Sequence, residues 1–540
     1  MSQEVWKVNP ADPGKLPEVP VTLPAGQKAV GVIISDGVVE VSAKTPEGIQ
    51  VDLSVMAPAF PDVTTANPHC VFQAWPGSTG TRRGGERAIY VPVGDDGSYF
   101  GVTVGALNFA TAQPHITSMF LAAPALQVAA SACTRVGTWS SSSNAATYAG
   151  SYYYSVVSGA TISASIKGTR AYARLFQSSN GGYGIVSIDG SYALPNRLPR
   201  FTAADLAAGR CRESDVGKPY VTAYGSAPWS EAFILADGLS DTTHTITIEA
   251  TGTKPAASTD YRLIVEALLG GSADNKIGDA NVHLCPTSML SQLSSAWSEY
   301  SWVARYTPSG GTNNYHMGGY HACSGTESQE VAVTPMTFAV DNVDRTSATA
   351  GTYYIGTLIT WGQTTTVAHG ETPATPALTK VRSYTAMANR PLPVMLDEQI
   401  TWSVAGTVTA TYPVMLHAGG YDRMTASVAG LWPTSGYLGS ARVTDFSKAD
   451  DSMDLYGGPK YGPGAPRMIF VGPSAVLWCA LDSESPPRGR QLSAAGRLAM
   501  QNRAYGDEKF YLASTYGSTF PVAVGDVERY VVGWGAAPAA

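Results

Sequence analysis

Apolar and polar residues alternate along most of this chain, in short runs that end at glycine or at an Asp-Gly pair. Alternation with a period of two is typical of half-buried β-strands, and Asp-Gly pairs favour hairpin turns. In residues 159–169, for example, Ile162 and Ile166 fall on one face, with small or polar residues between them. We therefore predict an all-β protein made of several antiparallel β-sandwiches, or jelly rolls, with few and short helices.

Helical periodicity is confined to three short stretches, residues 202–208, 286–298 and 493–498. Hydrophobic heptads are not sustained anywhere, which excludes a coiled-coil stalk. A short-period repeat is also missing, so a β-helix is not expected.

A chain of 540 residues is too long for one ordinary hydrophobic core, and we divide it into four parts. Residues 1–29 are proline-rich and predict an extended arm. Residues 30–130 predict a small β domain, whose Ala- and Ser-rich end at residues 122–132 predicts a linker or a short helix. Residues 131–270 predict a jelly roll, and residues 271–540 predict one large β-sandwich.

Charge and hydropathy exclude some classes of partner. The net charge of −7 argues against nucleic acid, which binds basic surfaces. Runs of apolar residues are too short to cross a membrane, so membrane insertion is not expected. The first residues lack a basic segment followed by an apolar one, so we expect no signal peptide and synthesis in a host cytoplasm.

Six cysteines lie scattered along the chain without a C-x-x-C pair. A zinc site would show paired spacing, and a disulfide framework would be denser. We therefore predict buried free thiols, no metal site and no cofactor. A structural Ca²⁺ ion at the Asp- and Asn-rich loops of the jelly roll stays open as an alternative.

Candidate catalytic groups are sparse. His316 and His321 lie near Glu327 and Glu330 in sequence, but this spacing on strands does not bring a full ligand set together. The serine motif of esterases is missing, and so are the signatures of jelly-roll polysaccharide lyases. A glycosidase needs only two suitably spaced carboxylates, which a sequence cannot exclude.

Aromatic residues in glycine- and serine-rich loops are the stronger signal. Tyrosine occurs 28 times, and many tyrosines stand outside the predicted strands. A flat ring with a polar tip can stack on the apolar face of a sugar, and arginine can hold an acidic sugar. The loop at residues 178–183 and the excursion at residues 210–229 are richest in such groups. Our candidate ligand-binding residues are Tyr183, Arg212, Tyr224, Trp229, His316 and His321.

Two segments of the sequence resemble known families. Residues 186–190 read V-S-I-D-G, residues 235–238 read L-A-D-G, and residues 244–248 read H-T-I-T-I. This order resembles the galactose-binding-domain-like jelly rolls, and the resemblance covers residues 152–269. Such modules decorate phage tail fibres, carbohydrate esterases and glycosidases.

The second segment contains G-G-Y-H-x5-E from Gly318 to Glu327, followed by F-A-V-D from Phe338 to Asp341. This order resembles large β-sandwich domains in tail-fibre and tail-spike-like proteins of tailed phages. The chain departs from that family at Ala322, where the family has glycine, and at Asn342 after Asp341.

These resemblances imply a virion receptor-binding protein, a fibre or spike that binds bacterial surface polysaccharide without cleaving it. Residues 30–130 would then attach the chain to other virion structural proteins, and we expect a homotrimer. One alternative is an architectural head, tail or baseplate protein that binds no receptor. The other is a polysaccharide lyase or glycoside hydrolase.

Overall fold

The computed structural model describes the residues in the following ranges: 28–35, 38–44, 50–54, 60–74, 87–95, 97–106, 114–144, 147–148, 150–194, 198–225, 228–279, 281–286, 302–318, 327–328, 330–349, 351–369, 372, 374–418, 435–438, 441–443, 460–463, 467–471, 475–485, 498–502, 508–513 and 515–539. Their regular secondary structure is almost entirely β-strand, as the alternating pattern predicts. All strand pairs among them are antiparallel except β20 with β21.

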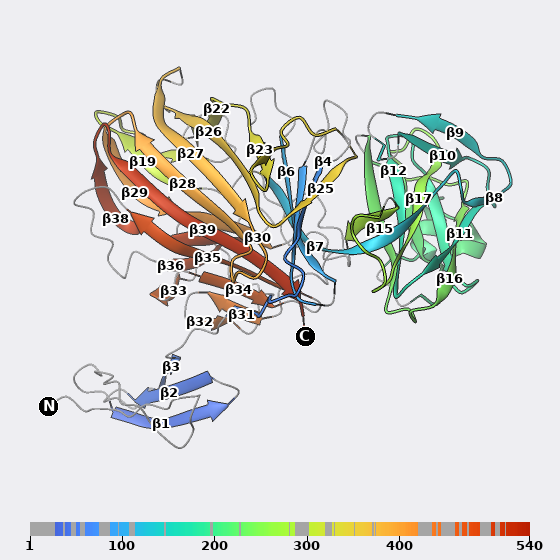
Figure 1. Cartoon of the computed structure of the whole chain (residues 1–540), viewed down its shortest axis with the longest axis horizontal. Helices are drawn as coiled ribbons and strands as arrows, with labels where there is room; N and C mark the ends of the chain where they lie inside the picture. Colours follow the sequence, from blue (N-terminus) through green and yellow to red (C-terminus); the bar gives the residue numbers. More distant parts are fainter. Residues whose placement is uncertain are drawn as a thin grey trace.

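The jelly roll forms two facing sheets (Figure 1). Its front sheet contains, in spatial order, β14 (Tyr220–Thr222), β13 (Tyr183–Ile188), β16 (Thr243–Ala250), β11 (Thr161–Lys167) and β8 (Thr134–Val136). Its back sheet is one part of an eleven-stranded sheet and contains β15 (Trp229–Asp237), β12 (Arg170–Gln177), β17 (Leu263–Gly271), β10 (Ser151–Ser155) and β9 (Ser140–Ser143).

The rest of that eleven-stranded sheet continues from β17 through β7 (Pro114–Ala129), β6 (Tyr99–Ala106), β5 (Arg87–Pro92), β4 (Cys70–Ala74) and β25 (Tyr353–Gly356), with β18 (Val282–Pro286) paired to β7. A further sheet of three strands comprises β1 (Lys28–Ser35), β2 (Val38–Lys44) and β3 (Gln50–Ser54).

The large sandwich contains three more sheets. The first contains β21 (Glu327–Ser328), β20 (Tyr315–Met317), β19 (Val303–Pro308), β29 (Gly406–Tyr412) and β38 (Thr515–Val522). The second contains β24 (Val343–Asp344), β23 (Thr337–Val340), β26 (Ile359–Ala368), β27 (Pro376–Ala386), β28 (Val394–Trp402), β39 (Val527–Pro538), β35 (Ala475–Ser485), β34 (Arg467–Val471), β31 (Ser435–Leu438) and β32 (Ala441–Val443), with β22 (Glu330–Ala332) paired to β26. The third contains β30 (Val414–Ala418), β37 (Glu508–Ala513), β36 (Leu498–Asn502) and β33 (Lys460–Pro463).

The jelly-roll core lies between its two sheets and is built from the inward face of each strand. Ile162 and Ile166 are both buried there, which confirms the face predicted from their spacing. Ile248 of the front sheet and Val265 of the back sheet belong to the same cluster. Burial of such side chains stabilises the fold by about 1.5–3 kcal/mol each.

Strand β7 joins the jelly roll to the large sandwich. Its first residues pair with β6, and residues 126–129 pair with β17 of the jelly roll. The expectation of a linker or short helix at residues 122–132 is therefore wrong for residues 122–129, which belong to β7. Alanine favours helices in isolation, but here Ala122 and Ala125 are fully buried beside neighbouring strands, and tertiary packing outweighs local propensity.

Residues between 63 and 121 and residues between 302 and 537 contribute to one hydrophobic core. Phe72 and Ile89 belong to the same buried cluster as Trp302 and Trp534. Strand β4 also pairs directly with β25. The structure thus joins two ranges that the sequence analysis placed in separate domains, and it holds the jelly roll against them through β7.

The helix predicted near residue 202 is present as α1 (Ala203–Ala207). Thr202 and Asp205 cap its start reciprocally, since each accepts a hydrogen bond from the backbone N–H of the other. For the other two predicted helices, Pro286 ends β18 and Leu498 begins β36, and the remaining residues lie outside the described ranges. Within the described ranges no helix is long and apolar enough to cross a membrane.

Candidate functional site

One end of the jelly roll gathers the loops that the sequence analysis singled out. The strand register places Gln177 opposite Trp229, Tyr183 opposite Thr222, and Ser155 opposite Leu263. The connections next to these residues must therefore lie together, and we call this the loop end. At its other end, at Gly271, strand β17 leads toward the junction with β7. Along the strands, the loop end thus faces away from the junction.

Three segments of the loop end form a platform, defined here as residues 178–182, 223–225 and 259–262. The first segment lies between the other two. Ser178 N donates to Ala223 O at 2.9 Å, and Gly225 N donates to Ser178 O at 3.1 Å. On the other side, Gly182 N donates to Arg262 O at 2.6 Å. Backbone hydrogen bonds thus fix loops that would otherwise be free to move.

Two glycines make this close packing possible. A Cβ atom on Gly181 would overlap the carbonyl oxygen of Ala223, and one on Gly182 would overlap the carbonyl group of Tyr261. Glycine lets two backbones approach where any side chain would separate them. The pair Gly181-Gly182 is therefore a requirement of the platform.

The platform carries aromatic and charged side chains at its surface, and Lys254 and Tyr154 border it. Tyr261 is 44% exposed, and the Lys254 ammonium lies 5.2 Å from its ring centroid. The Arg262 guanidinium lies 4.7 Å from the ring centroid of Tyr154, and its Nε donates to Asp260 Oδ2 at 2.9 Å. A flat ring beside donors and an acceptor is the combination that a sugar ring with its hydroxyl groups requires.

Tyr224 belongs to this platform, whereas Tyr183 lies beneath it. Tyr224 is half-buried and its backbone bridges to Ser178. Tyr183 is only 7% exposed and packs edge-on against Phe201 and Tyr220, with ring centroids 5.3 and 5.1 Å away. Burial raises the pKa of Tyr183 to about 12. Tyr183 therefore supports the loop end from inside instead of facing a ligand.

Trp229 lies at the loop end as the first residue of β15. Its backbone pairs with Gln177, while its side chain lies outside what the structure describes. The position agrees with the predicted site, and the contact of its indole ring stays a prediction.

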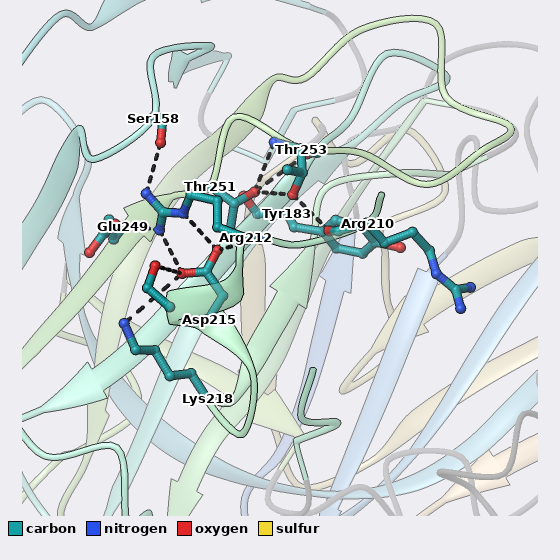
Figure 2. A network of polar contacts seen from close by, with 10 residues as sticks. Ser158, Tyr183, Arg210, Arg212, Asp215, Lys218, Glu249, Thr251 and Thr253 are labelled. Atoms are coloured by element: carbon teal, nitrogen blue, oxygen red, sulfur yellow. Dashed lines mark hydrogen bonds and ion pairs between the residues drawn. The ribbon is translucent and has the colours of Figure 1, made fainter. Parts of the chain in front are cut away.

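Arg212 is held by the protein itself (Figure 2). Its Nε and Nη2 donate to the two carboxylate oxygens of Asp215 at 2.7 and 2.8 Å. Nη2 also donates to Glu249 Oε1 at 2.8 Å, and Nη1 donates to Ser158 Oγ at 2.8 Å. These hydrogen bonds, first of all those donated to Asp215, raise the pKa of Arg212 above its ordinary value.

Arg212 thus ties the turn at Glu213–Asp215 to β16 instead of offering its guanidinium to an acidic sugar. Asp215 is fully buried, and a buried carboxylate without a charged partner would destabilise the fold; the ion pair with Arg212 avoids this cost. The neighbouring Arg210 side chain points away from this network in Figure 2, and it pairs with Asp205 at 3.0 Å.

The two candidate histidines are not brought together with the loop end. His316 is half-buried in β20, where its backbone pairs with Arg305 and with Glu327. His321 lies outside the described residues. Glu330 is fully buried in the sandwich core and contacts Lys380. Among the described residues, His, Cys, Asp and Glu form no group of three that could hold a metal ion.

Asp189, which the sequence indicates only as part of an Asp-Gly turn, also pairs with His244. Asp189 starts an Asp-Gly turn with a φ of 52°. Its Oδ2 lies 2.7 Å from His244 Nδ1, and its Oδ1 accepts from Thr245 N at 2.8 Å. His244 Nε2 lies 2.9 Å from the carbonyl oxygen of Ser240. Both ring nitrogens face acceptors, an arrangement that favours the doubly protonated imidazolium over a neutral ring that could act as a base toward the nearby Ser240 hydroxyl.

Sequence reasoning missed the residues that expose the most useful chemistry, namely Tyr154, Lys254, Asp260, Tyr261 and Arg262. Their signal was present in the chain, since an Asp-Tyr-Arg triplet stands directly before the apolar strand β17. Polar and aromatic residues at the start of a buried strand face the loops and not the core.

Five cysteines are described, and all are buried free thiols, as predicted: Cys70, Cys133, Cys211, Cys285 and Cys479. Cys323 lies outside the described residues.

Comparison of the sequence with models of protein families and with curated proteins gave no match. The functional assignment therefore rests on the geometry of the chain.

Proposed function

We propose that this chain is a fibre or spike component of a virus particle, which binds bacterial surface polysaccharide through the loop end of its jelly roll without cleaving it. The observation that carries this proposal is the platform. Its loops are fixed by backbone hydrogen bonds. It presents the exposed Tyr261 ring, which has the Lys254 ammonium beside it, and the adjoining Asp260–Arg262 ion pair. A rigid surface binds a flexible polysaccharide with a smaller loss of conformational entropy.

The position of the platform supports the same role. Strand β7 runs without a break from the jelly roll into the large sandwich, so the jelly roll is not tethered by a flexible linker. The loop end faces away from this junction along the strands, which suits a surface that meets a cell. Residues before β7, or other surfaces of the sandwich, would contact further virion proteins.

We also propose a homotrimer, because single sugar contacts are weak. Several copies of the platform on one particle raise the effective concentration of each further contact, so that avidity exceeds the affinity of one site by about 100-fold or more.

The test is binding of the full chain to an immobilised panel of bacterial surface polysaccharides. We expect binding to at least one of them, and about tenfold weaker binding for Tyr261→Ala, the loss typical of one aromatic anchor. The matched control is Tyr192→Ala. Tyr192 is also exposed, at 37%, and has the Lys218 ammonium 4.8 Å from its ring, but it follows the Asp189 turn at the other end of the strands.

Three outcomes would count against the proposal. Equal losses in both tyrosine variants would remove the platform from recognition. Release of new reducing ends or unsaturated uronates from the bound polysaccharide would show an enzyme. Binding to none of the panel, together with antibody labelling of an internal or baseplate position on virions, would show an architectural protein.

A further inference from the structure

The core of the large sandwich contains charged side chains that the proposed function does not use. Lys380 and Arg382 of β27, Glu398 of β28 and Glu330 of β22 are at most 2% exposed. They point into the same core as Trp302 and Trp402. Burying an ion pair costs several kcal/mol per ion, and apolar residues of the same size often give equal or greater stability. Stability alone therefore does not account for this cluster.

Lys380 lies between the two glutamates. Its Nζ is 2.9 Å from Glu398 Oε1 and 3.2 Å from Glu330 Oε2. Although the amine is so close, Glu398 Oε1 receives no hydrogen bond of normal geometry among the described residues. The amine therefore approaches this carboxyl group at an angle other than that of a hydrogen bond.

The two glutamates have different surroundings. Glu330 Oε1 accepts from Thr365 Oγ1 at 2.6 Å and lies 3.6 Å from Arg382 Nη2, which favours its ionised form. Glu398 Oε2 accepts from the backbone N–H of Trp302 at 2.8 Å. The carbonyl of the same Trp302 accepts from Lys380 Nζ at 2.9 Å. One residue thus fixes both the amine and the carboxyl group.

From this geometry we propose that Lys380 and Glu398 condense after folding to an intramolecular isopeptide bond, with Glu330 as the proton acceptor and donor. Glu330 takes a proton from the ammonium, and the neutral Nζ attacks Cδ of Glu398. The negative charge develops on Oε2, where the Trp302 N–H donates to it. A new Nζ–Cδ bond forms. Glu330 returns its proton to Oε1, a second proton passes from Nζ to the same oxygen, and the Cδ–Oε1 bond breaks to release water.

The step balances without any further reactant. Of the three hydrogens of the ammonium, one stays on the amide nitrogen and two leave with Oε1 as water. Neither oxidation nor reduction occurs. Before the reaction the cluster holds two positive and two negative charges; afterwards only the Arg382–Glu330 pair remains. Condensation thus removes two buried charges, which is a driving force that an exposed pair lacks.

Proximity makes such a reaction feasible in the folded chain. Groups held at contact distance react as if at effective concentrations of about 10⁵ M or more. All four charged side chains are shielded from bulk water, and the centroid of the Trp302 ring lies 5.8 Å from Nζ. The bond would tie β27 to β28 covalently, and a crosslink of this kind stabilises a protein by restricting its unfolded chain.

The test is the intact mass of the folded full chain. We expect a mass lower than that of the sequence by one water molecule, and a tryptic digest in which cleavage after Lys380 is blocked. The peptide that ends at Arg382 should be joined to the one that begins at Ser383 and contains Glu398. The exposed Lys167–Asp274 ion pair is the control within the same chain, and its peptides should stay separate.

Variants test the roles. Glu330→Gln keeps the shape of the side chain and should slow bond formation by about 100-fold, as expected for loss of a general acid–base. The double variant Lys380→Met with Glu398→Met replaces the pair by apolar residues, and should fold with the full sequence mass and a lower melting temperature. An unchanged intact mass for the wild-type chain after prolonged incubation overturns the proposal. Bond formation at the normal rate in Glu330→Gln overturns the role of Glu330.

Discussion

The loop end of the jelly roll and the core of the large sandwich contain the same kinds of residue in opposite surroundings. At the loop end, Arg262 lies beside Tyr154 and pairs with Asp260, and both charged side chains are about one-third exposed. In the sandwich core, Lys380 lies near Trp302 and pairs with Glu398, and both charged side chains are at most 1% exposed. Composition is similar in both clusters, whereas access to water differs.

This difference decides what each cluster can do. Exposed charges are solvated, contribute about 0–1 kcal/mol to stability, and can exchange water for a ligand. Buried charges cannot reach a ligand, and each depends on its partner to offset the loss of hydration. The loop end is therefore suited to recognition, and the sandwich core is suited to chemistry within the chain or to fixing one arrangement of strands.

The largest effect is expected when the buried cluster loses one charge. Arg382→Ala leaves Glu330 with fewer partners in the core, and we expect a loss of about 3–5 kcal/mol in the free energy of unfolding. Arg262→Ala at the loop end is the matched control and should cost less than about 1 kcal/mol. Denaturant unfolding of both variants gives the comparison. Equal losses would mean that burial does not separate the two regions.

A second variant lies between these extremes. Arg212 is 32% exposed, but its partner Asp215 is fully buried. Arg212→Ala should cost about 2 kcal/mol, because a buried carboxylate loses its charged hydrogen-bond donors. Arg210→Ala removes a neighbouring arginine that is 42% exposed, and should change stability by less than about 1 kcal/mol. Thermal unfolding of the two variants measures this, and a larger loss in Arg210→Ala would contradict the network drawn in Figure 2.

The sequence predicts the fold class well, because alternation and turn residues are local signals. The buried faces of Ile162 and Ile166 follow directly from spacing, and so does the short helix that begins after Thr202. Strand β7 does not, since its alanines are equally compatible with a helix. Its pairing with β17 depends on residues far away in the chain, and no local pattern contains that information.

Alternation also fails to tell which face of a strand is buried when the core is polar. In β27, Val381 stands between Lys380 and Arg382. The usual pattern places valine inside and the charged residues outside, but Val381 is 44% exposed and both charged residues are buried.

At the candidate site, the sequence predicts where residues lie along the chain but not which way their side chains face. Tyr183 and Arg212 lie at the predicted end of the jelly roll, but their packing partners decide that both support the site from within.

The smallest effect is expected for the Asp189–His244 pair, whose Asp189 side chain is 53% exposed. The hydrogen bond that His244 donates to Asp189, with a further one to the carbonyl of Ser240, raises the pKa of His244 above its ordinary value of 6.5, and the bond between His244 and Asp189 lowers the pKa of Asp189. The protonated imidazole therefore stabilises the folded chain fully below pH 6.5, and this contribution is lost as pH rises through the higher pKa of the folded state. Asp189 stays ionised throughout this range.

We expect the difference in the free energy of unfolding between the wild type and His244→Gln to shrink by about 0.5–1 kcal/mol between pH 5.5 and pH 8.5, as for a partly exposed ion pair. Thermal unfolding of both proteins at the two pH values measures this difference, with Lys167→Met as a control that should show no such dependence, because lysine stays charged across the range. An advantage that grows with pH would show that His244 is neutral in the folded chain, and would leave the Ser240 hydroxyl with a base beside it.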